Sequence, residues 1–149
     1  HTIGRRQRQM CIRDRDKSVK MSERLNLYKD RQRNNLSENA YGAIVRLRMD
    51  NSHPLGFGYD KEYLSLKLRN RRYAYLESGW NVGTTQDSTS IVSGFVGFKA
   101  KQNFRESLVF GVEEIGRGSV VYMVDNPLFR GFWYNGKLLF GNAVFLVGN

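Results

Sequence analysis

The sequence predicts an α/β layered domain in which a C-terminal helix packs on a β-sheet. Three features favour this fold class. The stretch "GAIVRLRMD" alternates apolar and polar residues, "SLVFGV" and "SVVYMV" are apolar runs rich in β-formers, and the closing stretch spaces its aromatic residues as a helix does. A length of 149 residues suits one domain with a hydrophobic core.

The positive charge of the chain is concentrated at its start. The formal net charge is +10, and residues 1–15 contribute five arginines against Asp14. The run "RRQRQMCIRDR" resembles translated sequencing-adapter read-through, so we interpret residues 1–15 as a non-native artefact. The alternative is a basic arm that binds nucleic acid. Under the first interpretation the only cysteine, Cys11, is not native, and the chain is a fragment of a longer protein.

Residues 16–40 are polar and charged, and they predict a helical lead-in to the domain. Met21, Leu25 and Tyr28 recur at roughly helical spacing, which favours a short, weakly amphipathic helix ending near "RNN". Residues 41–149 are then assigned to the α/β domain.

The first strand of the domain is predicted over residues 43–49, because Ala43, Val45, Leu47 and Met49 fall on one face. The Asn, Ser, Pro and Gly content of "DNSHPLGFGYD" predicts a turn-rich loop. The same criteria assign the following segments as a strand over 63–68, a short strand over 73–79, a loop over 80–90 and a short helical turn near "KAKQNFRE".

Two further strands are predicted over residues 107–112 and 119–124. The "EEIGRG" between them predicts a tight connection in which Gly116 and Gly118 supply positive φ angles. The second run is apolar at consecutive positions, which predicts a strand covered on both faces by helices.

The closing stretch predicts a helix of about five turns that starts at "DNP". Asp125 or Asn126 would cap it, Pro127 would occupy its first position, and Gly148 would end it. Its expected apolar stripe, buried on the sheet, consists of Phe129, Phe132, Trp133, Gly136, Phe140, Ala143, Val144 and Val147.

This helical spacing favours core packing of the aromatic residues over a surface that stacks on nucleic-acid bases. Arg130 and Lys137 are accordingly interpreted as local pairs or solvated flanks. The remaining basic patch, which could contact a polyanion or another domain, consists of Lys67, Arg69, Arg71 and Arg72.

No catalytic motif is recognisable in the residues themselves. His53 is the only histidine outside residues 1–15, and no HxxE or HExxH spacing occurs. A loop histidine bonded locally is the simplest interpretation of His53, and a stand-alone hydrolase that uses His53 is an alternative. Glu113 and Glu114 are adjacent acids beside a predicted turn, which is typical of solvated charge.

A family resemblance covers most of residues 23–147. The stretches "GAIVRLRMDNSHPLGFGY", "SGFVG" and above all "GRGSVVYMVDNPLFRGFWYNGKLLFGNAVF" resemble the C-terminal region of bacterial zinc carboxypeptidases of the carboxypeptidase A-like class. In that family a catalytic domain that holds zinc precedes a domain similar to class I glutamine amidotransferases. The resemblance implies an incomplete flavodoxin-like layered domain here, serving as a non-catalytic accessory domain of a secreted parent, periplasmic or extracellular, that removes C-terminal residues from peptides.

The resemblance transfers no active-site residue to this chain. The zinc ligands and catalytic glutamate of the family have no counterpart here, and residues 16–149 contain no cysteine for amidotransferase chemistry. We therefore expect no catalytic, cofactor-binding or metal-binding residue in the fragment, and assign the helix-start and core residues only a structural role: Asn126, Pro127, Phe129, Phe132, Trp133 and Phe140.

The expected partner is the missing N-terminal catalytic domain of the same chain, with peptide substrate reached only through it. No nucleic acid is expected, and no stretch approaches the ~20 apolar residues of a membrane span. An incomplete layered domain would leave a sheet edge and an apolar face open, which predicts a marginally stable or aggregation-prone fragment. A basic nucleic-acid-binding module is the other alternative function.

Overall fold

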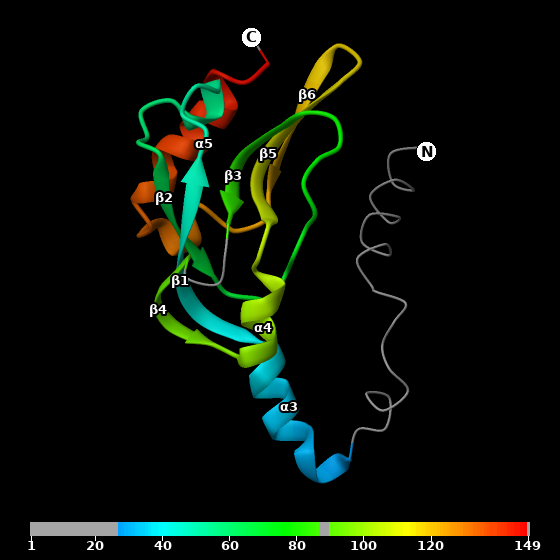
Figure 1. The fold of residues 1–149 in the computed structure, drawn as a ribbon. Coiled ribbons are helices and arrows are strands. Elements are labelled where there is room, and N and C mark those ends of the chain that lie inside the picture. The colour runs from blue at the N-terminus through cyan, green and yellow to red at the C-terminus, as the bar shows by residue number, and fades with distance from the viewer. Residues whose placement is uncertain (1–26, 87–89, 149) are drawn as a thin grey trace.

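The structure is a computed structural model that describes residues 27–86 and 90–148 (Figure 1). Its elements, in chain order, are η1 (Tyr28–Asp30), α3 (Arg31–Glu38), β1 (Ala40–Met49), η2 (Pro54–Gly56), β2 (Glu62–Lys67), β3 (Trp80–Thr85), β4 (Ile91–Val96), α4 (Phe98–Asn103), β5 (Ser107–Ile115), β6 (Gly118–Met123), η4 (Phe129–Gly131) and α5 (Asn135–Phe145). Met21, Leu25 and the artefact assigned to residues 1–15 lie outside the described residues.

The strands form one six-stranded sheet that is curled and antiparallel. Its order is β2-β1-β3-β5-β6, and β4 also pairs with β1. Two strands pair with the same edge of β1: β4 pairs with residues 40–45 and β3 with residues 48–49. The mixed α/β class is confirmed. The flavodoxin-like layering is not shown, since every pairing among the described strands is antiparallel, whereas flavodoxin-like sheets are mostly parallel.

Strand β1 confirms the predicted alternation. Ala43, Val45 and Leu47 are fully buried and Met49 nearly so, while the residues between them lie toward the other face. Gly42, with φ +76°, lies where the β1–β4 register shifts. Such a bulge bends a strand, and here it accompanies the curl of the sheet.

Strand β2 turns its polar residues inward. Tyr63, Ser65 and Lys67 are buried, whereas Leu64 lies on the exposed face. This orientation is the reverse of the one that hydrophobicity favours, and the ion pair of Lys67 described below accounts for it.

The loop predicted over residues 80–90 is wrong, because β3 occupies Trp80–Thr85 in the middle of the sheet. The glycine and polar residues of β3 make this segment look like a loop in the sequence, but Gly83 and Thr85 both have partners in the sheet. Gly83 lies against Phe110, where a Cβ atom would be 2.6 Å from the ring, and Thr85 is hydrogen-bonded to Ser107. The short strand predicted over 73–79 is also wrong. There the Asn81 side chain pairs with the backbone of Leu76 and takes the place of a strand ladder.

The tight connection between β5 and β6 is confirmed at Gly116. Ile115 pairs with Gly118, so Gly116 and Arg117 form a two-residue turn, and Gly116 has φ +64°. Gly118 does not have the positive φ predicted for it. Strand β6 is an edge strand with exposed or half-buried residues, so its predicted cover on both faces is also wrong.

Helix α5 begins at Asn135, and not at Pro127 as predicted. Arg130 and Gly131 have φ angles of 50° and 72°, which break any helix between Pro127 and Tyr134. Asn126 Oδ1 does accept a backbone N–H, from Leu128 at 2.9 Å, but it does so in a turn. The helix therefore has 11 residues, about three turns.

The predicted apolar stripe is wrong in part as a consequence. Phe132, Phe140 and Val144 are exposed, and α5 buries Leu139 and Asn142, which lie outside the predicted stripe. Gly136 is buried as predicted, and Ala143 and Val147 pack partly against the core. Phe129, Phe132 and Trp133 pack edge to face on one another in the loop before α5.

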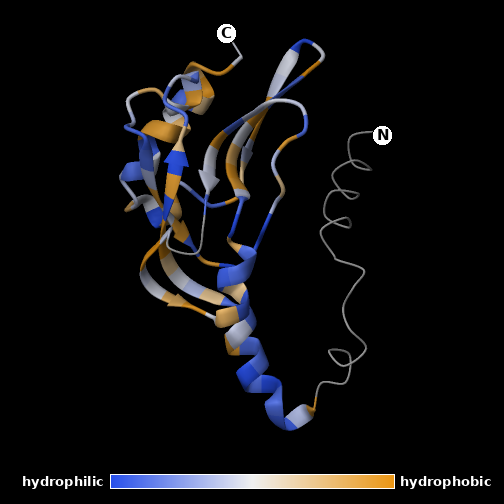
Figure 2. Cartoon of the chain, viewed as in Figure 1, coloured by the Kyte–Doolittle hydropathy of each residue, from blue (hydrophilic) through white to orange (hydrophobic). Residues whose placement is uncertain are grey.

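The hydrophilic α3 extends away from the sheet and buries no residue (Figure 2). It ends at Glu38, beyond the predicted end near "RNN", and α4 confirms the predicted short helical turn. The core lies on the buried face of the sheet, where Leu139 of α5 joins strand residues such as Leu47, Tyr63 and Phe110.

Candidate functional site

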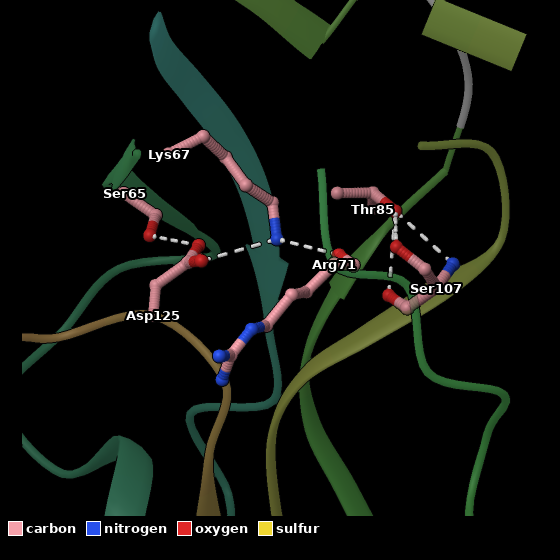
Figure 3. Close-up of polar contacts among 6 residues, drawn as sticks. All are labelled: Ser65, Lys67, Arg71, Thr85, Ser107 and Asp125. Atoms are coloured by element: carbon pink, nitrogen blue, oxygen red, sulfur yellow. Dashed lines mark hydrogen bonds and ion pairs between the residues drawn. The ribbon is translucent and has the colours of Figure 1, made fainter. Parts of the chain in front are cut away.

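The most deeply buried charges form a cluster of Ser65, Lys67 and Asp125, the interior polar cluster (Figure 3). Lys67 Nζ lies 3.1 Å from Asp125 Oδ1, and their side chains are 0% and 8% exposed. Ser65 Oγ donates to Asp125 Oδ2 at 2.7 Å, and Lys67 Nζ also donates to the Arg71 carbonyl at 3.5 Å. Each oxygen of the carboxylate therefore accepts a hydrogen bond.

The sheet topology explains the place of this cluster. Ser65 and Lys67 belong to β2 at one edge of the sheet order, whereas Asp125 follows β6 at the other edge. Their ion pair thus joins the two edges of the curled sheet across its interior. The Phe104 ring, 5.4 Å from Lys67 Nζ, adds a cation–π contact. Because both charges are satisfied by one another, the arrangement is that of a structural clamp and not of an activated lysine.

A second buried polar contact lies beside it. The hydroxyls of Thr85 and Ser107 are 2.8 Å apart, and the Ser107 N–H donates to Thr85 Oγ1 at 3.1 Å (Figure 3). These residues end β3 and begin β5, so the contact links neighbouring strands. Within the part of the chain that the structure describes, neither residue bonds to a histidine or carboxylate that could activate its hydroxyl.

The predicted surface patch of four basic residues is wrong in one member. Lys67 is fully buried, while Arg69, Arg71 and Arg72 are exposed. The patch therefore loses Lys67, the last residue of β2.

A surface cleft of about 600 Å³ is lined by several further polar side chains. We call it the His53–Trp80 cleft. It lies between the η2 loop, the start of β3, the β5–β6 hairpin and residues 146–148. The side chains relevant to its chemistry are Asp50, His53, Trp80, Glu114, Arg117 and Ser119.

His53 is held by its own loop. Its Nδ1 accepts the Leu55 N–H at 3.0 Å, and its ring lies 6.0 Å from the Trp80 ring. Burial lowers the pKa of His53 below its ordinary value, although the charge of Asp50 opposes this shift. The ring is therefore neutral at pH 7, with the proton on Nε2. The contacts of His53 among the described residues do not include a hydroxyl nucleophile.

Asp50 is the fixed anion of the cleft. Its Oδ1 accepts from the backbone N–H of Ser52 at 3.0 Å and from the Ser52 hydroxyl. These hydrogen bonds, chiefly the one from the hydroxyl, lower the pKa of the Asp50 carboxyl, so it is ionised at neutral pH.

Glu113 and Glu114 do not act together. Glu113 accepts hydrogen bonds from the Ser78 hydroxyl at 2.6 Å and the Tyr122 hydroxyl at 2.8 Å, whereas Glu114 is exposed and lines the cleft. Successive strand residues point to opposite faces, which separates the two carboxylates. Glu113 is thus half-buried and hydrogen-bonded, whereas Glu114 is solvated as predicted.

The cations of the closing stretch contact aromatic rings nearby. The Arg130 guanidinium lies 5.2 Å from the centre of the Phe129 ring, and Lys137 Nζ lies 3.8 Å from that of Tyr134. Pro127 is buried, and Gly136 packs so closely on it that a Cβ atom would lie 1.9 Å from the Pro127 carbonyl oxygen.

Sequence reasoning missed Trp80 and Asp125 as site residues. The sequence pattern places Trp80 in a loop and Asp125 at a helix start. One signal was available for the interior polar cluster: Ser65 and Lys67 alternate with leucines in "YLSLKL", so one face of this strand had to be polar.

Within residues 27–86 and 90–148, no three His, Cys, Asp or Glu side chains lie together in a way that could hold a metal ion. The described residues therefore do not fit the zinc of the resembled family. No helix in the same residues is long and apolar enough to cross a membrane. Comparisons with protein-family models, with curated proteins and with solved structures found no match to this chain.

Proposed function

We propose that this chain is a non-catalytic accessory domain of a zinc metallocarboxypeptidase, and that it docks on the catalytic domain of the same protein. The sequence resemblance supplies the identity of the partner. The observation that carries the docking role is an apolar surface on the face of the sheet opposite the core.

This surface, the outer apolar face, is built by strand pairing. Tyr41 pairs with Phe95 across β1 and β4, and these side chains are 54% and 52% exposed. Along the other edge of β1, which pairs with β2, Ile44 is the partner of Leu66. Leu64 lies two residues before Leu66 on the same face of β2. Partners in an antiparallel ladder project from the same face. Tyr41 and Ile44 both lie away from the buried face of β1, on either side of the register shift, so the two pairs share the outer face of the sheet. Contiguous exposed apolar patches are typical of interaction surfaces.

The polar groups of the chain support a non-catalytic role. Lys67 and Asp125 are engaged with each other inside the fold, and His53 uses Nδ1 to hold its own loop. A hydrolase that uses His53 would need a nucleophile and a second group to orient the ring. A docking domain needs only its shape and its apolar face.

A peptidase assay tests the non-catalytic role. We expect the purified chain to release no C-terminal residue from peptides when zinc is supplied. Zinc-dependent release that disappears in a His53→Ala variant would overturn the proposal and support the stand-alone hydrolase.

The docking role can be tested in the complete protein. Phe95→Lys places a charge in the outer apolar face, and we expect it to make the linker between domains more sensitive to limited proteolysis. Gln102→Lys, at an exposed position of α4, is the matched control and should leave the digestion rate unchanged. Equal digestion rates for Phe95→Lys and wild type would contradict docking through this face.

A further inference from the structure

We propose that the His53–Trp80 cleft binds a neutral carbohydrate. This inference concerns a different surface from the outer apolar face and does not depend on the accessory role.

Trp80 is the first observation that points to a ligand. It is 56% exposed at the start of β3, and it borders the cleft. An exposed tryptophan ring at the start of a central strand offers a large apolar area that a ligand can cover favourably. The C–H faces of a sugar ring are apolar, flat and of matching size, so a pyranose can cover the indole while its hydroxyls stay at the rim.

The polar side chains of the cleft supply both kinds of hydrogen-bonding group. Asp50 and Glu114 offer carboxylate acceptors, Arg117 offers guanidinium donors, and neutral His53 offers its Nε2–H. Sugar hydroxyls donate and accept at once, so they require this mixture. Planar carboxylate and guanidinium groups also suit the vicinal hydroxyl pairs of a pyranose.

The charges and polar groups of the cleft disfavour two other ligand classes that could stack on tryptophan. A nucleotide would bring its phosphate close to Asp50 and Glu114, against one arginine and a neutral histidine. A purely apolar ligand would leave the polar groups without water or partners. A neutral polyhydroxylated ligand avoids both costs. A cationic side chain is attracted by two carboxylates and repelled by one arginine, so a lysine peptide is the competing ligand in the test below.

The cleft is held in shape without a ligand. The loop that carries His53 is held by Asn142 of α5, whose Nδ2 donates hydrogen bonds to the carbonyls of Leu55 at 3.1 Å and Phe57 at 2.7 Å. Gly79, the residue before Trp80, packs closely on β5: a Cβ atom there would lie 2.4 Å from the Val112 carbonyl oxygen. This close packing fixes the backbone that carries Trp80. A preorganised site loses little conformational entropy on binding.

The test titrates the purified chain with cellohexaose, maltohexaose and the hexamer of N-acetylglucosamine, monitored by calorimetry and by tryptophan fluorescence. We expect at least one of these saccharides to bind with a Kd below about 1 mM. Trp80→Ala should weaken this binding by about tenfold or more, because the aromatic platform supplies most of the contact. Tyr134→Ala removes a comparably exposed aromatic residue outside the cleft and should leave the Kd unchanged.

A second variant separates an effect on saccharide binding from an effect on folding. Arg117 lies in the exposed turn between β5 and β6, so Arg117→Ala should weaken saccharide binding without changing the thermal unfolding transition. Three results would overturn the proposal: no saccharide binds the wild-type chain, Trp80→Ala binds as well as wild type, or the cleft binds adenosine monophosphate or a lysine peptide in preference to every saccharide.

Discussion

Lys67 and Asp125 come from opposite edges of the sheet order and meet in its interior, with Lys67 Nζ 3.1 Å from Asp125 Oδ1. The pair fixes the segment that follows β6 against β2. Because a buried charge without its partner is costly, the fold depends on both residues being present.

Loss of one partner should therefore be severe. We expect Asp125→Ala to lower the free energy of unfolding by about 3–5 kcal/mol, because Lys67 would be left buried and unpaired. The double variant Lys67→Met/Asp125→Leu should recover most of this loss. Urea unfolding followed by circular dichroism measures both. Glu62→Ala breaks the exposed pair of Glu62 with Arg46 and, as the control, should cost less than about 1 kcal/mol. Equal effects of Asp125→Ala and Glu62→Ala would contradict the clamp.

The buried face of α5 can be tested at two adjacent residues. Leu139 is fully buried and Phe140 is 44% exposed. Leu139→Ala should cost about 2–5 kcal/mol through the cavity it leaves. Phe140→Ala should cost clearly less, although its side chain is larger. Thermal unfolding of the two variants decides between this register and the stripe predicted from sequence, which required the opposite order.

The lowered pKa of His53 predicts an acid-sensitive fold. The folded pKa lies below the ordinary value of 6.5, so the unfolded state binds the proton more tightly. The free energy of unfolding should thus fall as the pH drops from about 7.5 to about 5.5. His53→Gln should reduce this dependence. An NMR titration, with the His53 resonance assigned through the variant, should give a pKa below 6.5; a pKa above 6.5 would contradict the desolvated ring.

The outer apolar face should make the isolated chain associate. Size-exclusion chromatography of the wild type should show concentration-dependent oligomers or aggregates. The double variant Tyr41→Lys/Phe95→Lys should shift the chain toward monomer, whereas Lys substitutions at the exposed positions Gln102 and Asn103 should not. A wild-type chain that is monodisperse and melts cooperatively as a monomer would contradict this prediction and the fragment interpretation with it.

The parts of the fold that sequence predicted well are those in which local pattern and burial agree. The alternation in β1 marks its inner face because Ala43, Val45 and Leu47 all belong to the hydrophobic core. Gly116 marks a turn because a two-residue hairpin requires its positive φ.

The errors arise where distant contacts override local signals. Strand β3 contains Asn81 and Gly83, and its place in the sheet depends on Phe110 filling the space above Gly83. Asn126 and Pro127 look like a helix start, but the positive φ of Arg130 delays the helix to Asn135. The His53–Trp80 cleft unites segments far apart in sequence, so no local motif could reveal it.

The genomic coding sequence upstream of residue 16 tests the accessory-domain account most directly. We expect an open reading frame that continues upstream into a domain with an HxxE motif and a later histidine, the pattern of ligands that a catalytic zinc requires. An in-frame start close to residue 16, or an upstream domain without such a motif, would contradict the account.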